Sequence, residues 1–300
     1  MYDFSNTSIQ TEHDQQGTEI EQQKYWNAKF AIFETEYYRF NDKYVNLQEM
    51  LQSTNGVIYS AESVSDQSKQ VVIKKIWKDR VATFHDFADG RECPNEIWYH
   101  LKAQQASPKL IIPLLDWFEF EEFYLAVMPK IEGACDLFQL LQQNGPLSEK
   151  RAKSIFRQLV KVCSDLQQNG ICHRDIKDEN VLIDKNDHIY LIDFGTTMDY
   201  DTSYSDLVGT ECFFSPEYFD RGFFRPEELT VWSLGAVLYM LLVRCWRFDR
   251  QTQSWHRNTS DERHLSASAI QLIDQVLNPI PEDRATLAVI ENAEWLSSAN

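Results

Sequence analysis

The feature that most constrains the fold is a change in hydrophobic periodicity near residue 132. Before it, short runs rich in β-branched and aromatic residues predict a helix at about residues 93–105 and strands at residues 44–51, 56–63, 70–77, 110–118 and 123–128. After it, apolar residues recur at helical spacing in residues 136–143, 148–170, 231–243 and 266–277. Strands followed by helices predict an α+β fold with two lobes, a β-rich N-lobe over 44–131 and an α-helical C-lobe over 132–297.

The first 43 residues differ in composition from this domain. They begin acidic and rich in Gln, which predicts disorder, and then turn aromatic at Tyr25, Trp26, Phe30, Phe33, Tyr37 and Tyr38. We expect the aromatic part to form a helix that docks on its own domain, with a partner-binding helix as the alternative. Residues 1–43 are therefore treated as an N-terminal extension, partly disordered.

The bulk composition excludes several classes of protein. A net charge of −17 argues against binding to nucleic acid or anionic lipid and favours basic partners. The six cysteines are scattered without a CxxC pair, and no secretion signal is visible, so we expect a reducing intracellular compartment, the cytoplasm or the nucleus. The longest apolar run, residues 231–243, is about thirteen residues and too short to span a bilayer, which predicts a buried helix and no membrane segment.

The loop HRDIKDEN, residues 173–180, crowds cations and carboxylates between two apolar runs. Phosphoryl transfer from ATP to a hydroxyl needs a carboxylate to accept the hydroxyl proton, a cation beside the phosphoryl group and oxygen ligands for Mg²⁺. Asp175 would be the base, Lys177 the cation and Asn180 a metal ligand. Further along, LIDFG supplies Asp193 as the second metal ligand. The alternative, a coincidental set of surface charges, does not explain why several motifs agree in order.

Other motifs fit the same chemistry. VVIKK closes a predicted strand with Lys74, which would contact the phosphates, and PNEIW offers Glu96 on the following helix to hold that lysine. Downstream, the segment GTECFFSPEYF carries Thr210, expected to hydrogen-bond near Asp175 and Lys177. In the same segment lies Glu217, and PEDRAT supplies Arg284 as its expected buried partner.

Together these motifs resemble those of the eukaryotic protein kinase family over residues 44–297, and CHRDIKDENVLID, LIDFG, SPEYF and VWSLGAVLYML resemble the Pim group of Ser/Thr kinases. The resemblance implies the two-lobed kinase fold, ATP with Mg²⁺ as phosphoryl donor and a protein Ser or Thr as acceptor. By default we expect a monomer. It also assigns nucleotide-binding roles around the hinge VMPKIEG. Met128 would be the gatekeeper, Pro129 can only accept a hydrogen bond, and Ile131 would donate one to adenine. The remaining residues that would line the adenine slot are Ile58, Val72, Leu182 and Ile192.

The chain departs from the family pattern at two places. Leu51 and Ser53 stand where kinases usually carry the first two glycines of the phosphate-covering loop, and only Gly56 is retained, so phosphate clamping is expected to be weaker. Thr230 replaces an aspartate that usually bonds the catalytic-loop backbone, and its hydroxyl is expected to make part of that bond. A pseudokinase scaffold that binds without turnover therefore stays an alternative. A small-molecule kinase is disfavoured by the peptide-docking segment from Thr210 to Glu217.

Acidic residues beside the site suggest the substrate class and the mode of regulation. Glu179 and Asp136 would pair with arginines N-terminal to the acceptor, or else are solvated charges, and Asp178 is expected to be solvated. Arg174 is either structural or receives a phosphate from the candidate acceptors Thr197, Thr202, Ser203, Tyr204 and Ser205. Asp199, Asp201 and Asp206 would already supply that charge, so obligatory phosphorylation is not expected. His173 and Cys212 are expected to pack structurally.

Overall fold

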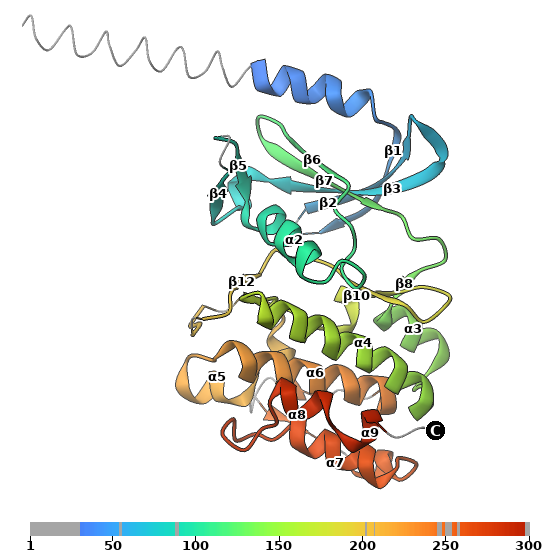
Figure 1. Cartoon of the computed structure of the whole chain (residues 1–300), viewed down its shortest axis with the longest axis vertical. Helices are drawn as coiled ribbons and strands as arrows, with labels where there is room; N and C mark the ends of the chain where they lie inside the picture. Colours follow the sequence, from blue (N-terminus) through green and yellow to red (C-terminus); the bar gives the residue numbers. More distant parts are fainter. Residues whose placement is uncertain are drawn as a thin grey trace, which may run out of the picture. The chain divides into compact units, whose positions relative to one another are not determined.

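The computed structural model of the 300-residue chain describes residues 31–53, 56–87, 90–201, 203–206, 208–244, 248–249, 254–256 and 259–297 (Figure 1). The first 30 residues of the predicted extension, together with Thr202 and Cys245, lie outside the described residues.

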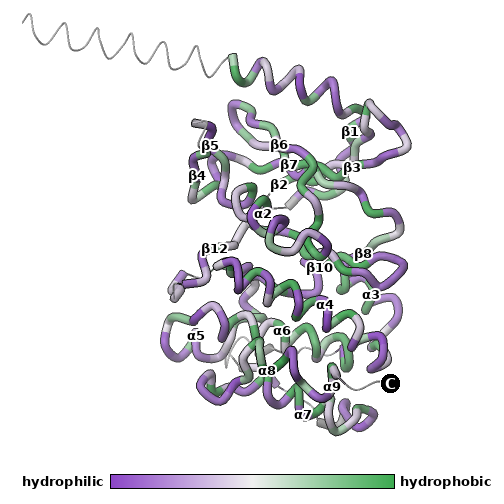
Figure 2. The backbone as a smooth tube through the Cα atoms, in the orientation of Figure 1, coloured by the Kyte–Doolittle hydropathy of each residue, from purple (hydrophilic) through white to green (hydrophobic). Residues whose placement is uncertain are grey.

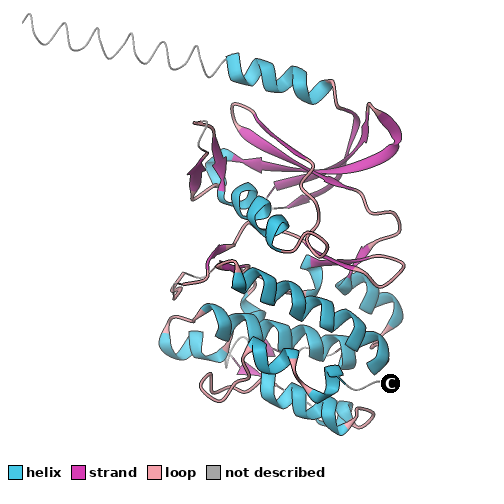
Figure 3. Ribbon diagram, viewed as in Figure 1, coloured by secondary structure: helices cyan, strands magenta, loops and turns pink. Residues whose placement is uncertain are grey.

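The chain divides into two compact units, each described here by itself. One is formed by residues up to Val81 with Leu115–Lys130, and the other by Ala82–Leu114 with residues from Ile131 onward. The first is mainly strands and the second mainly helices, which confirms the expected α+β class (Figure 3). The units are not the two consecutive segments expected from the sequence, because residues 82–114 cluster with the helical unit.

A five-stranded antiparallel sheet in the order β1-β2-β3-β7-β6 forms the first unit (Figure 1). Its strands are β1 (Tyr44–Ser53), β2 (Gly56–Ser63), β3 (Asp66–Trp77), β6 (Asp116–Glu119) and β7 (Phe123–Pro129). A short 3-10 helix, η1 (Lys78–Arg80), follows β3. Val71, Ile73, Leu125 and Val127 are buried together on one face, as alternating strand side chains require.

The predicted strand at 110–118 is wrong in its first half. Its end, residues 116–118, pairs in the sheet of the first unit. Leu110–Ile112 belongs to the second unit and pairs there with Leu191, through Leu191 N to Leu110 O (2.8 Å) and Ile112 N to Leu191 O (3.2 Å). Pro113 has no N–H to donate to a ladder at the point where the chain leaves this pairing. The apolar run was therefore split between two units.

Residues 31–41 form a helix whose last turn packs on the sheet of the first unit. Phe40 meets the ring of Phe118 edge-on at 5.2 Å between centroids, and Arg39 bonds the Asp116 carboxylate at 3.2 Å. Tyr37 and Tyr38 on the same helix are exposed. The described part of the aromatic extension thus docks on its own domain through its end.

Gly56, the retained glycine and the first residue of β2, has a packing reason to be glycine. Its φ is +152°, and a Cβ there would lie 2.2 Å from the carbonyl oxygen of Lys75 on β3. We expect Gly56→Ala to lower the free energy of unfolding by about 3 kcal/mol, since it combines backbone strain with a clash against main chain. Thermal unfolding measures this.

Gly222→Ala is the matched control, because Gly222 also has a positive φ (+72°) but open space around the position of its Cβ. Its expected cost is about 1 kcal/mol, from left-handed backbone alone. Equal losses in the two variants would show that the contact with Lys75 does not matter.

The second unit consists of helices with short strands between them. Its helices are α2 (Asn95–Ala106), α3 (Leu137–Asn144), α4 (Glu149–Gln168), α5 (Pro216–Arg221), α6 (Pro226–Val243), α7 (Ala267–Val276), α8 (Leu287–Glu291) and α9 (Glu294–Ser297). Its 3-10 helices are η2 (Asp178–Asn180), η3 (Glu211–Phe213) and η4 (Thr259–Glu262). Its strands are β4 (Phe84–Asp86), β5 (Glu92–Pro94), β8 (Cys135–Asp136), β9 (Ile171–Cys172), β10 (Val181–Ile183), β11 (Ile189–Leu191), β12 (Met198–Asp199), β13 (Phe248–Asp249) and β14 (Ser254–Trp255).

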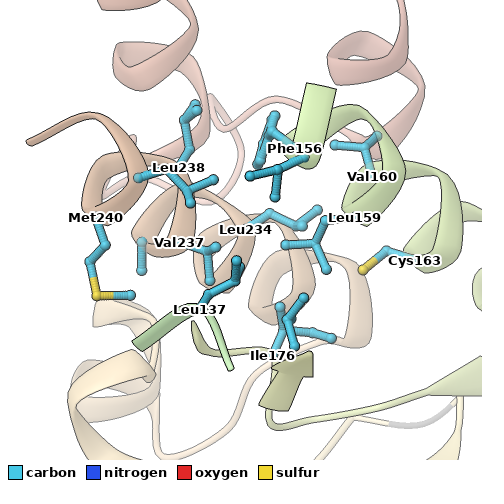
Figure 4. Close-up of a cluster of buried hydrophobic side chains, with 14 of the residues drawn as sticks. Leu137, Phe156, Leu159, Val160, Cys163, Ile176, Leu234, Val237, Leu238 and Met240 are labelled. Carbon is cyan, nitrogen blue, oxygen red and sulfur yellow. The ribbon is translucent and has the colours of Figure 1, made fainter. Parts of the chain in front are cut away.

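The core of this unit lies between α4 and α6. Phe156 and Leu159 of α4 face Leu234 and Leu238 of α6, and all four are fully buried (Figure 4). The helix α6 is apolar along most of its length (Figure 2). Among the described helices it has the length and hydropathy of a membrane span. However, 83% of this 18-residue segment is buried inside the protein, as in a core helix.

A buried ion pair ties α5 to the segment before α8. Arg284 donates from two guanidinium nitrogens to the two carboxylate oxygens of Glu217, at 2.8 and 2.7 Å, and both side chains are almost fully buried. Burial acts to raise the pKa of Glu217, but the hydrogen bonds and charge of Arg284 outweigh it and lower that pKa. This confirms the partnership predicted from the sequence.

Candidate active site

The loop from His173 to Asn180 runs from β9 into η2 and is anchored in the core of the second unit by a buried side chain. Ile176 is 2% exposed and packs beside Leu137 and Leu159 (Figure 4). Val181, which follows η2, is also buried. The charged residues of the loop are therefore carried by a backbone that apolar contacts hold in place.

Asp175, Lys177 and Thr210 form one hydrogen-bonded group. The Thr210 hydroxyl donates to Asp175 Oδ1 at 2.8 Å, Lys177 Nζ donates to Thr210 Oγ1 at 2.8 Å, and Lys177 Nζ lies 3.1 Å from Asp175 Oδ2. Thr210 thus lies where the sequence predicted it. Its position in the segment before η3 brings a distant part of the chain onto the loop.

Asn180 completes the surroundings of Asp175. Its Nδ2 donates to Asp175 Oδ2 at 2.9 Å and to the Asp175 carbonyl at 2.8 Å. Both amide protons are then used, so the oxygen Oδ1 is the group of Asn180 left to serve as a metal ligand.

Asp193 lies in the same unit, and its surroundings place Glu96 close by. Gly195 N donates to Asp193 Oδ1 at 3.3 Å, and Ile192 N donates to the Asn180 carbonyl at 3.0 Å. Asp193 Oδ1 and Glu96 Oε2 each lie 3.4 Å from the position that a Cβ on Gly195 would occupy. Asn180 and Asp193 provide oxygen ligands of the kind that Mg²⁺ prefers, with phosphate oxygens and water as the usual remainder, so the residues present fit a magnesium ion.

His173 is a packed structural histidine, as expected. The Asp175 amide donates to its Nδ1 at 3.3 Å, so Nε2 carries the proton and donates to the Ile192 carbonyl at 3.0 Å. Burial lowers the pKa of this imidazole, although the Asp175 carboxylate acts in the opposite direction. Its ring also meets Phe194 at 5.1 Å.

Lys177 is held in its protonated form by the carboxylates around it. Burial acts to lower the pKa of Lys177, but the Asp175 carboxylate, followed by Glu179 and Asp193, outweighs burial and raises it. A protonated ammonium is therefore available beside the base at neutral pH.

Arg174 is neutralised without a phosphate. Its side chain is 2% exposed, donates to Asp206 Oδ1 at 2.7 Å and lies over the Tyr204 ring at 4.3 Å. Of the acidic residues expected to supply this charge, Asp206 is the one in contact.

The expectation that Asp178 is solvated is wrong. Asp178 is 4% exposed in η2, and burial, followed by the charge of Glu179, raises its pKa to about 6. The short helical turn directs it inward while Glu179 keeps a side chain that is 49% exposed. Asp136 caps α3, accepting from Gln139 N at 2.7 Å with one of its two oxygens.

Thr230 does not bond the catalytic-loop backbone as predicted. Its hydroxyl donates to the Pro226 carbonyl one turn back in α6 at 2.7 Å, a common choice for threonine in a helix. Cys172, just before the loop, places its Sγ 3.9 Å from Thr230 Oγ1. Cys212, expected to have a packing role, is partly buried against the core.

Five of the nucleotide-binding residues predicted in the first unit share one face of its sheet, and Pro129 lies on the other face. Cross-strand pairs join Leu51 to Ile58, Ile58 to Lys74 and Val72 to Met128, so their side chains point to the same side. This is the face opposite the buried cluster of Val71 and Ile73. Pro129 pairs with Val71 at the end of β7, and the next residue, Lys130, donates its N–H to the Gln70 carbonyl.

The other predicted adenine contacts belong to the second unit. Leu182 on β10 pairs with Asp136 on β8, while Ile192 directly precedes Asp193. Ile131 begins the turn after the hinge, where its carbonyl accepts from Ala134 N at 3.2 Å. The structure thus joins Asp175, Lys177, Thr210 and Asn180 through direct contacts and places the adenine candidates on separate elements.

Two residues on α2 were missed in the sequence. Asn95 and Tyr99 flank Glu96 on this helix and hydrogen-bond the segment after Asp193. The one available signal was an asparagine beside Glu96 with no helix-capping role, since Pro94 occupies the N-cap position.

Comparisons with known proteins agree with this geometry. The family model described as "Protein kinase domain" matches residues 44–296. The chain is 32% identical over 254 residues to serine/threonine-protein kinase pim-2 of Danio rerio, covering 82% of each chain. It is 32% identical over 272 residues to serine/threonine-protein kinase prk-2 of Caenorhabditis elegans, covering 86% of this chain and 59% of that one. A PAS domain-containing serine/threonine-protein kinase of Mus musculus is 32% identical over 263 residues, 86% of this chain but 19% of its own length. On its motifs, its geometry and these matches, the chain belongs to the protein kinase family.

Proposed function

We propose that this chain, a protein serine/threonine kinase by family, transfers the γ-phosphoryl group of ATP to Ser or Thr hydroxyls of basic protein substrates. The observation that carries the proposal is the Asp175 carboxylate, which is held by Thr210, Lys177 and Asn180 at distances of 2.8 to 3.1 Å. A base fixed by three donors is oriented before the substrate arrives.

In this proposal each residue has one task in the transfer. The acceptor oxygen attacks the γ-phosphorus, the bond from that phosphorus to the β–γ bridging oxygen breaks, and ADP leaves with the electron pair. Asp175 orients the hydroxyl and takes its proton. Lys177 lies beside the base as a cation that neutralises charge on the moving phosphoryl group.

Asn180 and Asp193 would hold the metal. Mg²⁺, when bound, supplies positive charge that offsets the phosphate oxygens. Lys74 on β3 would position the phosphates, with Glu96 as its partner in the family pattern.

The proposed substrate class is supported by charge. Glu179 is half exposed next to the base, Asp136 keeps one carboxylate oxygen outside its helix cap, and the chain carries a net charge of −17. These features support recognition of arginines N-terminal to the acceptor. The match to pim-2 over most of both chains supports a Pim-like subgroup. The proposal also includes a monomer in the cytoplasm or the nucleus.

The test compares phosphoryl transfer to an Arg-rich serine peptide and to a peptide with alanines in place of the arginines. Glu179→Gln is expected to raise the KM for the Arg-rich peptide about tenfold, the size of one lost charge-assisted contact, and to leave the alanine peptide unaffected. Glu291→Gln, an exposed change at the end of α8, is the control. Equal use of the two peptides by the wild-type protein would contradict basic-motif recognition.

The second candidate function is a scaffold that binds nucleotide without turnover. Leu51 and Ser53 in place of two glycines favour it, because a Cβ obstructs the approach of backbone amides to phosphates. ATP binding with no transfer above that of an Asp175→Asn protein would establish the scaffold instead.

A further inference from the structure

Helix α2, which carries Glu96, is hydrogen-bonded at two points to the segment that follows Asp193. Asn95 Nδ2 donates to the Thr197 carbonyl at 2.7 Å, and the Tyr99 hydroxyl donates to Asp199 Oδ1 at 2.8 Å. All of these residues belong to the second unit.

The first contact is supported by His85, which holds the Asn95 side chain from its other end. With Nδ2 of Asn95 donating, Oδ1 can only accept, so His85 Nε2 donates to it at 2.9 Å. The His85 ring stacks on Trp98 at 4.9 Å with only 5° between the planes, which fixes the imidazole. Asn95 is therefore held by the β4–β5 hairpin while it holds Thr197.

In the second contact the tyrosine is buried and keeps its hydroxyl proton, whereas Asp199 is exposed. Tyr99 is 3% exposed, and burial, followed by the hydrogen bond to Asp199, raises its pKa far above the usual range, so the hydroxyl stays a donor. Asp199 is itself fixed, because β12 pairs with β9 just before His173 and the Tyr204 hydroxyl donates to the Asp199 carbonyl.

We propose that Asn95 and Tyr99 are positioning residues that fix α2, and with it Glu96, against the segment after Asp193 without any phosphate. Neither residue lies among those assigned to substrate, metal or nucleotide. They flank Glu96 in sequence, and the segment that they bind also bonds the catalytic loop through Thr196 Oγ1 to the His173 carbonyl at 3.0 Å. Helix, metal-binding turn and catalytic loop are thus joined by these hydrogen bonds.

The test is a double-mutant cycle of Tyr99→Phe and Asp199→Ala, read in two ways. The first readout is hydrogen exchange of the amides from Gly195 to Asp199, which needs no activity. The second is kcat for peptide phosphorylation, which rests on the proposed function. Each single variant is expected to speed exchange and to lower kcat about tenfold, and the double variant is expected to be no worse than either.

Two further variants separate positioning from stability. Asp199→Asn keeps an acceptor oxygen and is expected to retain most of kcat. Asn95→Asp keeps the shape and favours a helix N-terminus, yet has no donor for the Thr197 carbonyl, so faster exchange and lower kcat are expected despite an intact helix.

Tyr44→Phe is the matched control, since it removes another hydrogen bond from a buried tyrosine to an aspartate, Asp116 at 3.2 Å, in the first unit. It is expected to lower Tm slightly and to leave exchange at Gly195–Asp199 and kcat unchanged. Unchanged exchange in Tyr99→Phe, independent multiplying losses in the cycle, or a kcat equal to the wild type's would overturn the inference. If the wild type transfers no phosphoryl group, the proposed function fails while the exchange data still decide the positioning role.

Discussion

Replacing Asp175 with asparagine is expected to lower kcat roughly 100- to 10,000-fold, the range that a positioned general base contributes. Asparagine keeps the shape and the acceptor oxygen toward Thr210, but it cannot take the hydroxyl proton and places an NH₂ group toward Lys177 or Asn180. Radiolabel transfer from Mg-ATP to a serine peptide measures the loss.

The matched control is Asp187→Asn. Asp187 is bonded to Arg151 in a turn outside the site and has a φ of +60°, which asparagine tolerates. This variant is expected to keep its kcat. Nucleotide-induced thermal shifts should be alike in both variants, and an Asp175→Asn protein with near wild-type turnover would remove Asp175 from the role of base.

Replacing Arg284 with methionine is expected to cost about 3–5 kcal/mol of the free energy of unfolding. The reason is the Glu217 carboxylate, which is 2% exposed and would be left buried without its partner. Chemical denaturation measures this loss. It should shrink as the pH falls, because the folded-state pKa of Glu217 is lowered, so the stability from the pair is present above about pH 4.5 and is lost as the pH falls through the folded-state pKa.

Two comparisons separate the effect of leaving Glu217 as an unpaired buried charge from the other effects of removing an arginine. Arg221→Met breaks an exposed pair with Glu282 in the same part of the unit and should change Tm little. The double variant Glu217→Leu with Arg284→Leu removes both charges and should recover much of the loss. A single Arg284→Met variant as stable as the wild type would mean that water or another group reaches Glu217.

The sequence predicted well what depends on local pattern. The main helices of the second unit and most strands of the sheet appear within a few residues of their predicted bounds, because hydrophobic periodicity reports burial directly. Thr210 was placed beside Asp175 and Lys177 from motif order, and the hydrogen bonds agree.

What the sequence could not supply are choices between competing partners. The run at 110–118 is mostly apolar on both sides of Pro113, and the pairing of Leu110–Ile112 with Leu191 is seen only in the tertiary structure. Thr230 was expected to bond the catalytic-loop backbone, but its hydroxyl donates to the Pro226 carbonyl in its own helix. The roles of Asn95 and Tyr99 could not be predicted from hydrophobic periodicity, which reports local burial. Each of them bonds a residue about a hundred positions away.

The backbone bonds around Asn180 and Asp193 have a consequence for metal binding. Ile192 N bonds the Asn180 carbonyl, and His173 bridges the Asp175 amide to the Ile192 carbonyl. The spacing of the two proposed ligands is therefore set by main-chain atoms and one buried ring, so folding has already spent the conformational entropy of bringing them together. Binding of an ion there would therefore cost little further conformational entropy of the protein. Any residue except proline at position 192 could supply the backbone N–H that bonds the Asn180 carbonyl.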